Sequence, residues 1–246
     1  MKKKPKALIM ENVAGILSRK HKNVVAGITK ALEKNGFVVF WGRLNGLHTG
    51  VPTDRDRAFC VGIRKDCYRR EFHFPPPLGV ADRVVLADVL DPFNDKTDKV
   101  CRMPKAKRMR KLISSACSEA KAKGIDAREV PLAVDIDCSP KFRCWGQNFA
   151  KTLTKSRGRA GGPWISTRGR RTTTDELMRI QGFLPCEIPF KKAGVSKTTM
   201  GEMLGNCVPV NMIGFLLPNV LWSAGLVSQK PKFKNRILEF QGNDGE

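Results

Sequence analysis

The order of apolar runs at the start of the chain constrains its fold more than any other feature. Residues 7 to 10 form a short apolar run that ends at Glu11 and Asn12, which indicates a buried strand carrying an acid and an amide to its end. Residues 20 to 35 then show helical periodicity. Two β-rich runs follow, FVVFWGRLNG and RAFCVGIRK. This order predicts an α/β sheet, a class that keeps its ligands at strand ends.

The charge balance indicates a polyanionic partner. The 246 residues include 45 Lys and Arg against 23 Asp and Glu, a formal net charge of +22. Such an excess causes self-repulsion in a compact fold, and nucleic acid is the simplest partner to relieve it. A hydrophobic content of 41% is enough for a substantial core.

The cysteine spacing does not favour a metal site. None of the eight cysteines forms a C-x-x-C pair, so we expect no metal and reduced thiols in an intracellular protein. We also expect no membrane partner, because Pro218 and Asn219 interrupt the longest apolar stretch, residues 212 to 227.

Composition shifts at the proline-rich FHFPPPLG, residues 72 to 79, which indicates a domain boundary. The basic stretch KTLTKSRGRAGGPWISTRGRR, residues 151 to 171, holds no acid. Thr173 and Glu176 then have the spacing of a capping box at the start of a helix.

Four separated motifs stand in a fixed order: ENV, GVPTDRDRAFCVGIR, RRTTTDELMRIQGF and LGNCVPV. Together they resemble the later part of the DNA cytosine carbon-5 methyltransferase family, from its ENV motif to its last motif. The resemblance implies an incomplete Rossmann-like α/β methyltransferase sheet with a smaller irregular target-recognition domain. It also implies three segments: a partial catalytic domain of residues 1–68, a target-recognition domain of residues 69–165, and residues 166–246, which hold a hinge motif and return to the catalytic domain.

The resemblance also implies roles for particular residues. Glu11 would bind ring nitrogen 3 and the amino group of a flipped cytosine. Arg55 and Arg57 match the arginines of a Q-x-R-x-R motif, in which one contacts the base and the other holds structure; Thr53 stands in place of the Gln.

The last motifs imply a cofactor pocket and a DNA-binding surface. S-adenosylmethionine would be bound in part by Asn206, Cys207 and Val208. The helix after Thr173 is mainly architectural in the family. The residues predicted to contact duplex DNA are Lys151, Lys155, Arg157, Arg159 and Arg170.

Two family motifs have no match in this chain. The Pro-Cys motif, which supplies the attacking thiolate, and the glycine-rich cofactor loop should precede ENV, but only ten residues precede Glu11. Pro185 and Cys186 stand in the wrong place, and too few residues follow Val210 for a circular permutation to restore the missing half. We therefore expect a fragment or split subunit that is inactive alone, with an incomplete cofactor pocket, an exposed sheet edge and a second polypeptide as partner.

Two alternatives stay open. A non-catalytic DNA-binding protein derived from this family would use the basic stretches 102–111 and 151–171 for phosphate contacts. A basic RNA-binding protein is the other, although 7% aromatic residues give little for base stacking. The runs KKKPK and KAKRMRK resemble nuclear-import signals, so we expect a nuclear location if the source is eukaryotic.

Overall fold

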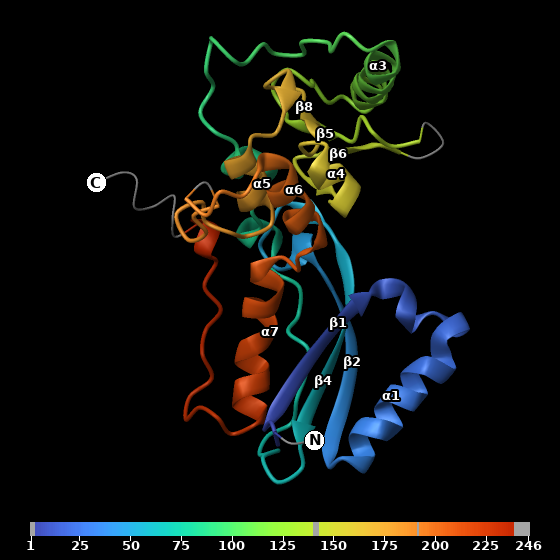
Figure 1. Cartoon of the computed structure of the whole chain (residues 1–246), viewed down its shortest axis with the longest axis vertical. Helices are drawn as coiled ribbons and strands as arrows, with labels where there is room; N and C mark the ends of the chain where they lie inside the picture. The colour runs from blue at the N-terminus through green and yellow to red at the C-terminus, as the bar shows by residue number, and fades with distance from the viewer. Residues whose placement is uncertain (1–2, 140–142, 191, 239–246) are drawn as a thin grey trace.

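The structure, a computed structural model, describes residues 3–139, 143–190 and 192–238 (Figure 1). Its lower half is a three-layer sandwich. The sheet has the order β1 (Ala7–Val13), β4 (Asp56–Arg64), β2 (Phe37–Asn45), and β4 is antiparallel to both neighbours. Helix α1 (Lys22–Lys34) lies on one face and α7 (Val210–Ser223) on the other. The expected α/β class is confirmed, and β1 and β2 run in the same direction.

The alternation of side chains along β4 explains the two cores of this sandwich. Phe59 and Val61 on β4 point towards α7, where Leu216 packs against them. Cys60, between them in sequence, points to the other face and packs with Leu32 of α1. Helix α1 ends where expected, because Gly36 has a φ of 83° and turns the chain into β2.

The upper half contains a four-stranded antiparallel sheet and one long helix. The strand order is β6 (Trp145–Gln147), β5 (Leu132–Val134), β8 (Trp164–Ile165), β9 (Arg170–Arg171). Helix α3 (Lys107–Lys121) packs on this sheet through one apolar face. Residues 80 to 150 show little periodicity in the sequence, so helix α3 was not predicted.

Short elements connect the two halves. A parallel pair links the lower strand β3 (Thr53–Asp54) to the upper strand β7 (Ala150–Lys151). The remaining short elements are η1 (Ala14–Leu17), η2 (Arg19–His21), η3 (Gly46–His48), η4 (Val80–Asp82) and α2 (Leu86–Val89).

Two features bear on the predicted segment boundaries. Phe72 lies in the lower core beside Phe40, with ring centroids 4.9 Å apart, although it falls after residue 68. Strands β8 and β9 belong to one sheet across residue 165. The boundaries themselves stay a prediction.

Helices α4 (Lys155–Arg159), α5 (Thr174–Ile180) and α6 (Lys197–Asn206) lie between the two halves (Figure 1). The Gly and Asn of the motif LGNCVPV form the last turn of α6, and residues 207 to 209 separate α6 from α7. The stretch Lys197–Ser223 is long and apolar enough to cross a membrane, but half of its most apolar window is buried in the protein. Core helices share these properties, so this stretch does not indicate a membrane span.

Helices α4 and α6 approach so closely that only glycine fits between them. A Cβ on Gly201 would lie 2.1 Å from the carbonyl oxygen of Gly158, and one on Gly158 would lie 1.9 Å from that of Gly201. Because both obstacles are backbone atoms, no side-chain rotation relieves them. This contact fixes α6, and with it the start of α7, against α4.

We expect Gly201→Ala to lower the free energy of unfolding by about 1–3 kcal/mol, because α6 must move away from α4. Gly27→Ala on α1 is the matched control: no atom lies within 4 Å of its added Cβ. There the better helix propensity of Ala should raise stability by up to about 1 kcal/mol. Urea unfolding of both variants measures the difference, and equal effects would contradict the close approach.

Candidate active site

Glu11 and Arg57 form an ion pair on adjacent strands. The Arg57 Nε lies 2.7 Å from Glu11 Oε1, and their side chains are 13% and 27% exposed. Glu11 stands opposite Phe59 in the register of β1 with β4, so Arg57, two residues earlier on β4, is its diagonal neighbour. The pairing of β1 with β4 therefore positions Glu11 and Arg57 next to each other.

Arg55 is buried and holds three distant parts of the chain together. Its side chain donates from Nη1 to the carbonyl oxygen of Leu153 at 2.6 Å and from Nη2 to that of Cys207 at 2.7 Å. Burial, and next the charge of Arg57, lower the pKa of Arg55, yet a guanidinium stays charged at neutral pH. Arg55 thus has a positioning role, whereas Arg57 contacts the acid.

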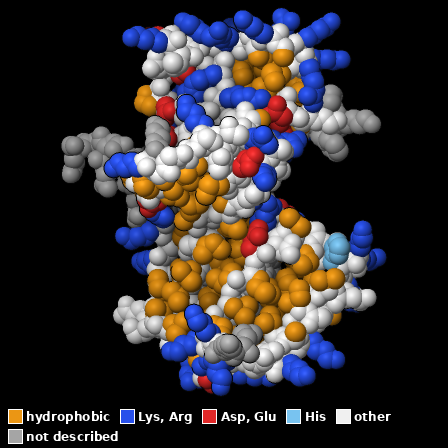
Figure 2. Space-filling view, in the orientation of Figure 1, with side chains coloured by type: hydrophobic (Ala, Val, Ile, Leu, Met, Phe, Trp, Pro, Cys, Tyr) orange, Lys and Arg blue, Asp and Glu red, His pale blue; other side chains and the backbone are white. Residues whose placement is uncertain are grey.

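These residues line one open cleft of about 390 Å³. Figure 2 shows the surface hollowed between the upper and lower halves. The walls of the cleft include Glu11, Arg55, Arg57, Lys155 and Asn206. Three motifs far apart in the sequence, those containing Glu11, the arginines and Asn206, are therefore brought together.

The three residues predicted for cofactor binding differ in position. Asn206 is exposed at the cleft. Cys207 is turned away from it: its Sγ donates to the carbonyl oxygen of Leu204 at 3.0 Å, and its own carbonyl accepts from Arg55. Val208 packs against the core under α7. Only Asn206 therefore offers its side chain to a ligand, and cofactor contacts for all three stay a prediction.

Among the residues that the structure describes, this cleft holds no activated thiol. Burial raises the pKa of Cys207 to about 11, so its thiol is protonated at neutral pH. Within residues 3–139, 143–190 and 192–238 no cysteine lines the cleft, and Cys186 is exposed elsewhere. The same described residues contain no group of three or more metal-ligating side chains.

The five cations predicted to bind DNA all have acidic partners within the protein, a feature that the sequence did not reveal. Arg157 lies 2.9 Å from Asp135. The carboxylate of Glu202 on α6 forms ion pairs with Lys155 at 3.7 Å and with Arg159 at 3.5 Å. These pairs tie α4 to its surroundings, and DNA contact by these residues stays a prediction. The other two, Lys151 and Arg170, pair respectively with Asp54 and with Asp98 and Glu176.

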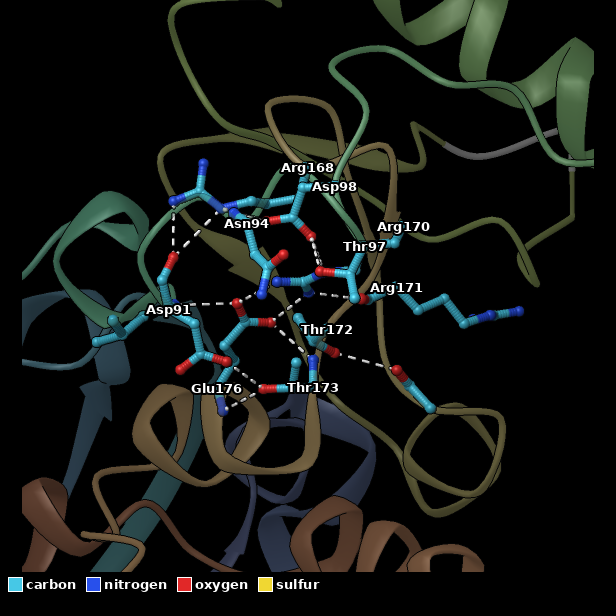
Figure 3. Close-up of polar contacts among 12 residues, drawn as sticks. Asp91, Asn94, Thr97, Asp98, Arg168, Arg170, Arg171, Thr172, Thr173 and Glu176 are labelled. Carbon is cyan, nitrogen blue, oxygen red and sulfur yellow. Dashed lines mark hydrogen bonds and ion pairs between the residues drawn. The ribbon is translucent and has the colours of Figure 1, made fainter.

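Arg170 is the centre of a buried network (Figure 3). It bonds both oxygens of Glu176, at 2.8 and 3.0 Å, and Asp98 Oδ1 at 2.6 Å; both carboxylates are fully buried. Glu176 also accepts the backbone N–H of Thr173 at 2.6 Å, which completes the predicted capping box of α5. With its guanidinium fully occupied, Arg170 has a structural role in this fold.

The carboxyl of Asp98 is held ionised. Burial alone raises the pKa of Asp98, but hydrogen bonds from Arg170 and the Asn94 backbone, with the charge of Arg170, outweigh it and hold that pKa below its usual value. Because the pKa of Asp98 is lower in the folded state than in the unfolded state, this group stabilises the fold at a pH above its unfolded-state pKa. That stabilisation is lost as the pH falls through its folded-state pKa.

Comparison with known proteins identifies the fold and the family of this chain. The fold is that of a methyltransferase: the structure of the S. pombe Dnmt2 methyltransferase aligns with a TM-score of 0.55 and 15% identity, over 89% of this chain and 65% of that one. The profile of the C-5 cytosine-specific DNA methylases matches residues 1–222. The chain belongs to this family, as its motifs predicted, and the family uses S-adenosylmethionine as methyl donor.

Two curated relatives show how much of a family member is present. The Type II methyltransferase M.FnuDI of Fusobacterium nucleatum is 40% identical over 91 residues, 37% of this chain and 26% of its own length. M.SsoII of Shigella sonnei is 24% identical over 220 residues, 89% of this chain and 54% of its own length. The chain thus spans about half of the longer match.

We expect Arg55→Met to lower the free energy of unfolding by about 3 kcal/mol, because buried carbonyl groups lose a charged donor. Arg43→Met is the matched control, since the ion pair of Arg43 with Asp56 is solvent-exposed. Urea unfolding should show little change for the control. Equal stability of the two variants would contradict the positioning role.

We expect Asp98→Asn to destabilise the protein at pH 7 and progressively less below about pH 5, because the wild-type carboxylate is then protonated on unfolding. Asp95→Asn, on the same loop but exposed, should change little at any pH. Unfolding followed from pH 7 to pH 3 measures this. A destabilisation by Asp98→Asn that is constant with pH would exclude an electrostatic role.

Proposed function

We propose that these 246 residues are the base-binding and DNA-recognising part of a DNA cytosine carbon-5 methyltransferase that acts on duplex DNA. One observation carries the proposal. Glu11, paired with Arg57, shares a cleft with Asn206, and buried Arg55 holds the walls of that cleft together. Three motifs that would otherwise have unrelated positions thus form one site.

Glu11 has the chemistry that a flipped cytosine needs. The ionised carboxylate can accept a hydrogen bond from the exocyclic amino group of the cytosine. The protonated carboxyl can donate a hydrogen bond to ring nitrogen 3, and this bond makes ring carbon 6 more electrophilic. Arg57 orients this carboxylate and neutralises its charge. An ion pair set by two paired strands keeps the acid in place before the base arrives.

Asn206 supports a partial cofactor site. Its amide is exposed at the cleft and has no hydrogen-bond partner among the described residues, so it is available to a polar ligand. S-adenosylmethionine would supply the methyl group. In this proposal, further protein completes the cofactor pocket around Asn206.

Methyl transfer in this proposal needs a nucleophile from outside these residues. The raised pKa of Cys207, and the absence of cysteine from the cleft within the part that the structure describes, both favour this. Strand β1 pairs with β4 on one edge only, and no other described strand occupies its second edge. A segment carrying the Pro-Cys motif and the cofactor loop could extend the sheet there, in the same polypeptide or in another.

The second candidate is a non-catalytic DNA-binding protein of this family. The lack of an activated thiol at the cleft, within the part of the chain that the structure describes, fits this candidate as well as it fits the first. Methyl transfer in the presence of a segment that carries the cofactor loop therefore decides between the two candidates. Both candidates act on DNA and therefore imply an intracellular location, nuclear in a eukaryote.

The test is methyl transfer to duplex DNA from labelled S-adenosylmethionine. The chain alone should be inactive, and the chain joined to the amino-terminal half of a relative such as M.SsoII should be active. Glu11→Gln in the joined protein should lower the rate about 100-fold or more, because base activation is lost, while duplex binding is retained. Glu33→Gln, an exposed acid on α1, is the matched control.

Robust transfer by the chain alone would refute the need for an outside nucleophile. A joined protein that binds duplex DNA but transfers no methyl group would favour the non-catalytic candidate. Full activity of the Glu11→Gln protein would refute the assigned role of this acid.

A further inference from the structure

We propose that an exposed basic face on and before α3 is the principal DNA-backbone contact of this protein, in place of the cations of residues 151–171. This inference rests on the proposed action on duplex DNA and adds the surface that holds it. We call this surface the α3 basic face; it consists of Arg102, Lys105, Lys107, Arg110 and Lys111.

The packing of α3 separates its two sides. Leu112, Ile113 and Ala116 are buried in the upper core, where Trp145 packs against the helix. All five residues of the α3 basic face are exposed. Arg108 is held differently, by a 2.8 Å hydrogen bond to the carbonyl oxygen of Cys138, and is not part of the face. Lys107, Arg110 and Lys111 therefore point to solvent from a well-packed helix, and Arg102 and Lys105 are exposed on the segment before it.

These charges do not stabilise the helix that carries them. The first turn of α3 contains Lys107, Arg108 and Arg110 and no acid, and its N-cap residue, Ala106, provides no side-chain hydrogen bond. A helix amino terminus has a partial positive charge, so cations there are unfavourable. Sequence and fold thus retain a repulsive arrangement that an external polyanion would relieve.

The α3 basic face also lacks internal partners. Within residues 3–139, 143–190 and 192–238 no acidic side chain forms an ion pair with any of its five cations. By contrast, each of the five cations predicted from the sequence has an acidic partner. Breaking an internal pair reduces the gain from a phosphate contact, whereas an unpaired surface cation gives the full counterion release.

The face lies on the upper half of the molecule, which also carries the sheet of β6, β5, β8 and β9. Figure 1 shows α3 at the top, and Figure 2 shows Lys and Arg side chains gathered over that end. Helix α1 lies at the opposite end. A duplex held at the cleft and reaching upwards would meet the α3 basic face, and the sequence-independent pull of phosphates would position it.

The experiment measures binding of the full chain to a fluorescent DNA duplex over a range of salt concentrations. The test variant carries Lys107→Gln, Arg110→Gln and Lys111→Gln together. The matched control carries Lys30→Gln, Lys34→Gln and Lys65→Gln, which remove the same charge from exposed positions in the lower half. The slope of log Kd against log salt should fall by about 3 in the test variant and stay unchanged in the control.

Three other results would contradict the proposed DNA contact of the α3 basic face. If wild-type chain binds the duplex and both variants lose slope equally, the α3 basic face is not the contact, although the proposed function stands. If wild-type chain does not bind duplex DNA, both the face and the proposed function fail. If the test variant loses affinity only for an RNA duplex, the partner is RNA and the DNA contact is refuted.

A thermal melt separates binding from folding. Removing cations from the first turn of α3 relieves repulsion, so the melting temperature of the test variant should be equal to or above that of the wild type. A lower melting temperature together with weaker binding would show that these cations serve the fold, and would overturn the proposal.

Discussion

The site depends on the burial of one guanidinium, that of Arg55. Its donors reach Leu153 and Cys207, which are 98 and 152 residues away in sequence. Both acceptors are backbone carbonyls, so the contact specifies where these segments run and not which side chains they carry. A charged group in this position is stable only because its hydrogen bonds replace water. The cleft exists because the two segments are held at the distance that this side chain spans.

Local patterns in the sequence were sufficient for the elements that bear on the cleft. The helix that ends at Gly36, the strand that carries Glu11 and the capping box of Thr173 each follow from rules that act over a few residues, and all three are present. The motif order also identified the family correctly. Convergence of Glu11, Arg57 and Asn206 could be inferred only through that resemblance, because no local rule relates residues so distant in sequence.

The sequence alone could not show which residues far apart in the chain contact each other. A run of basic residues looks the same whether its charges meet solvent or acids from other segments, and the acids here come from residues as distant as Asp98 and Glu202. Helix α3 was missed because its apolar face is narrow, with small residues such as Ala116 and Ala120 in place of large ones. The contact of Gly158 with Gly201 was likewise invisible, since glycine gives no periodic signal.

The exposed outer edge of β1 affects the solubility of the protein. Met10 and Val13 are exposed along the strand, and no Lys or Pro lies within Ala7–Val13 to discourage pairing with another chain. Bare edges of this kind template intermolecular ribbons, the first step towards insoluble aggregates. A segment that paired along this edge would remove the template, so the solubility of the protein depends on how the edge of β1 is covered.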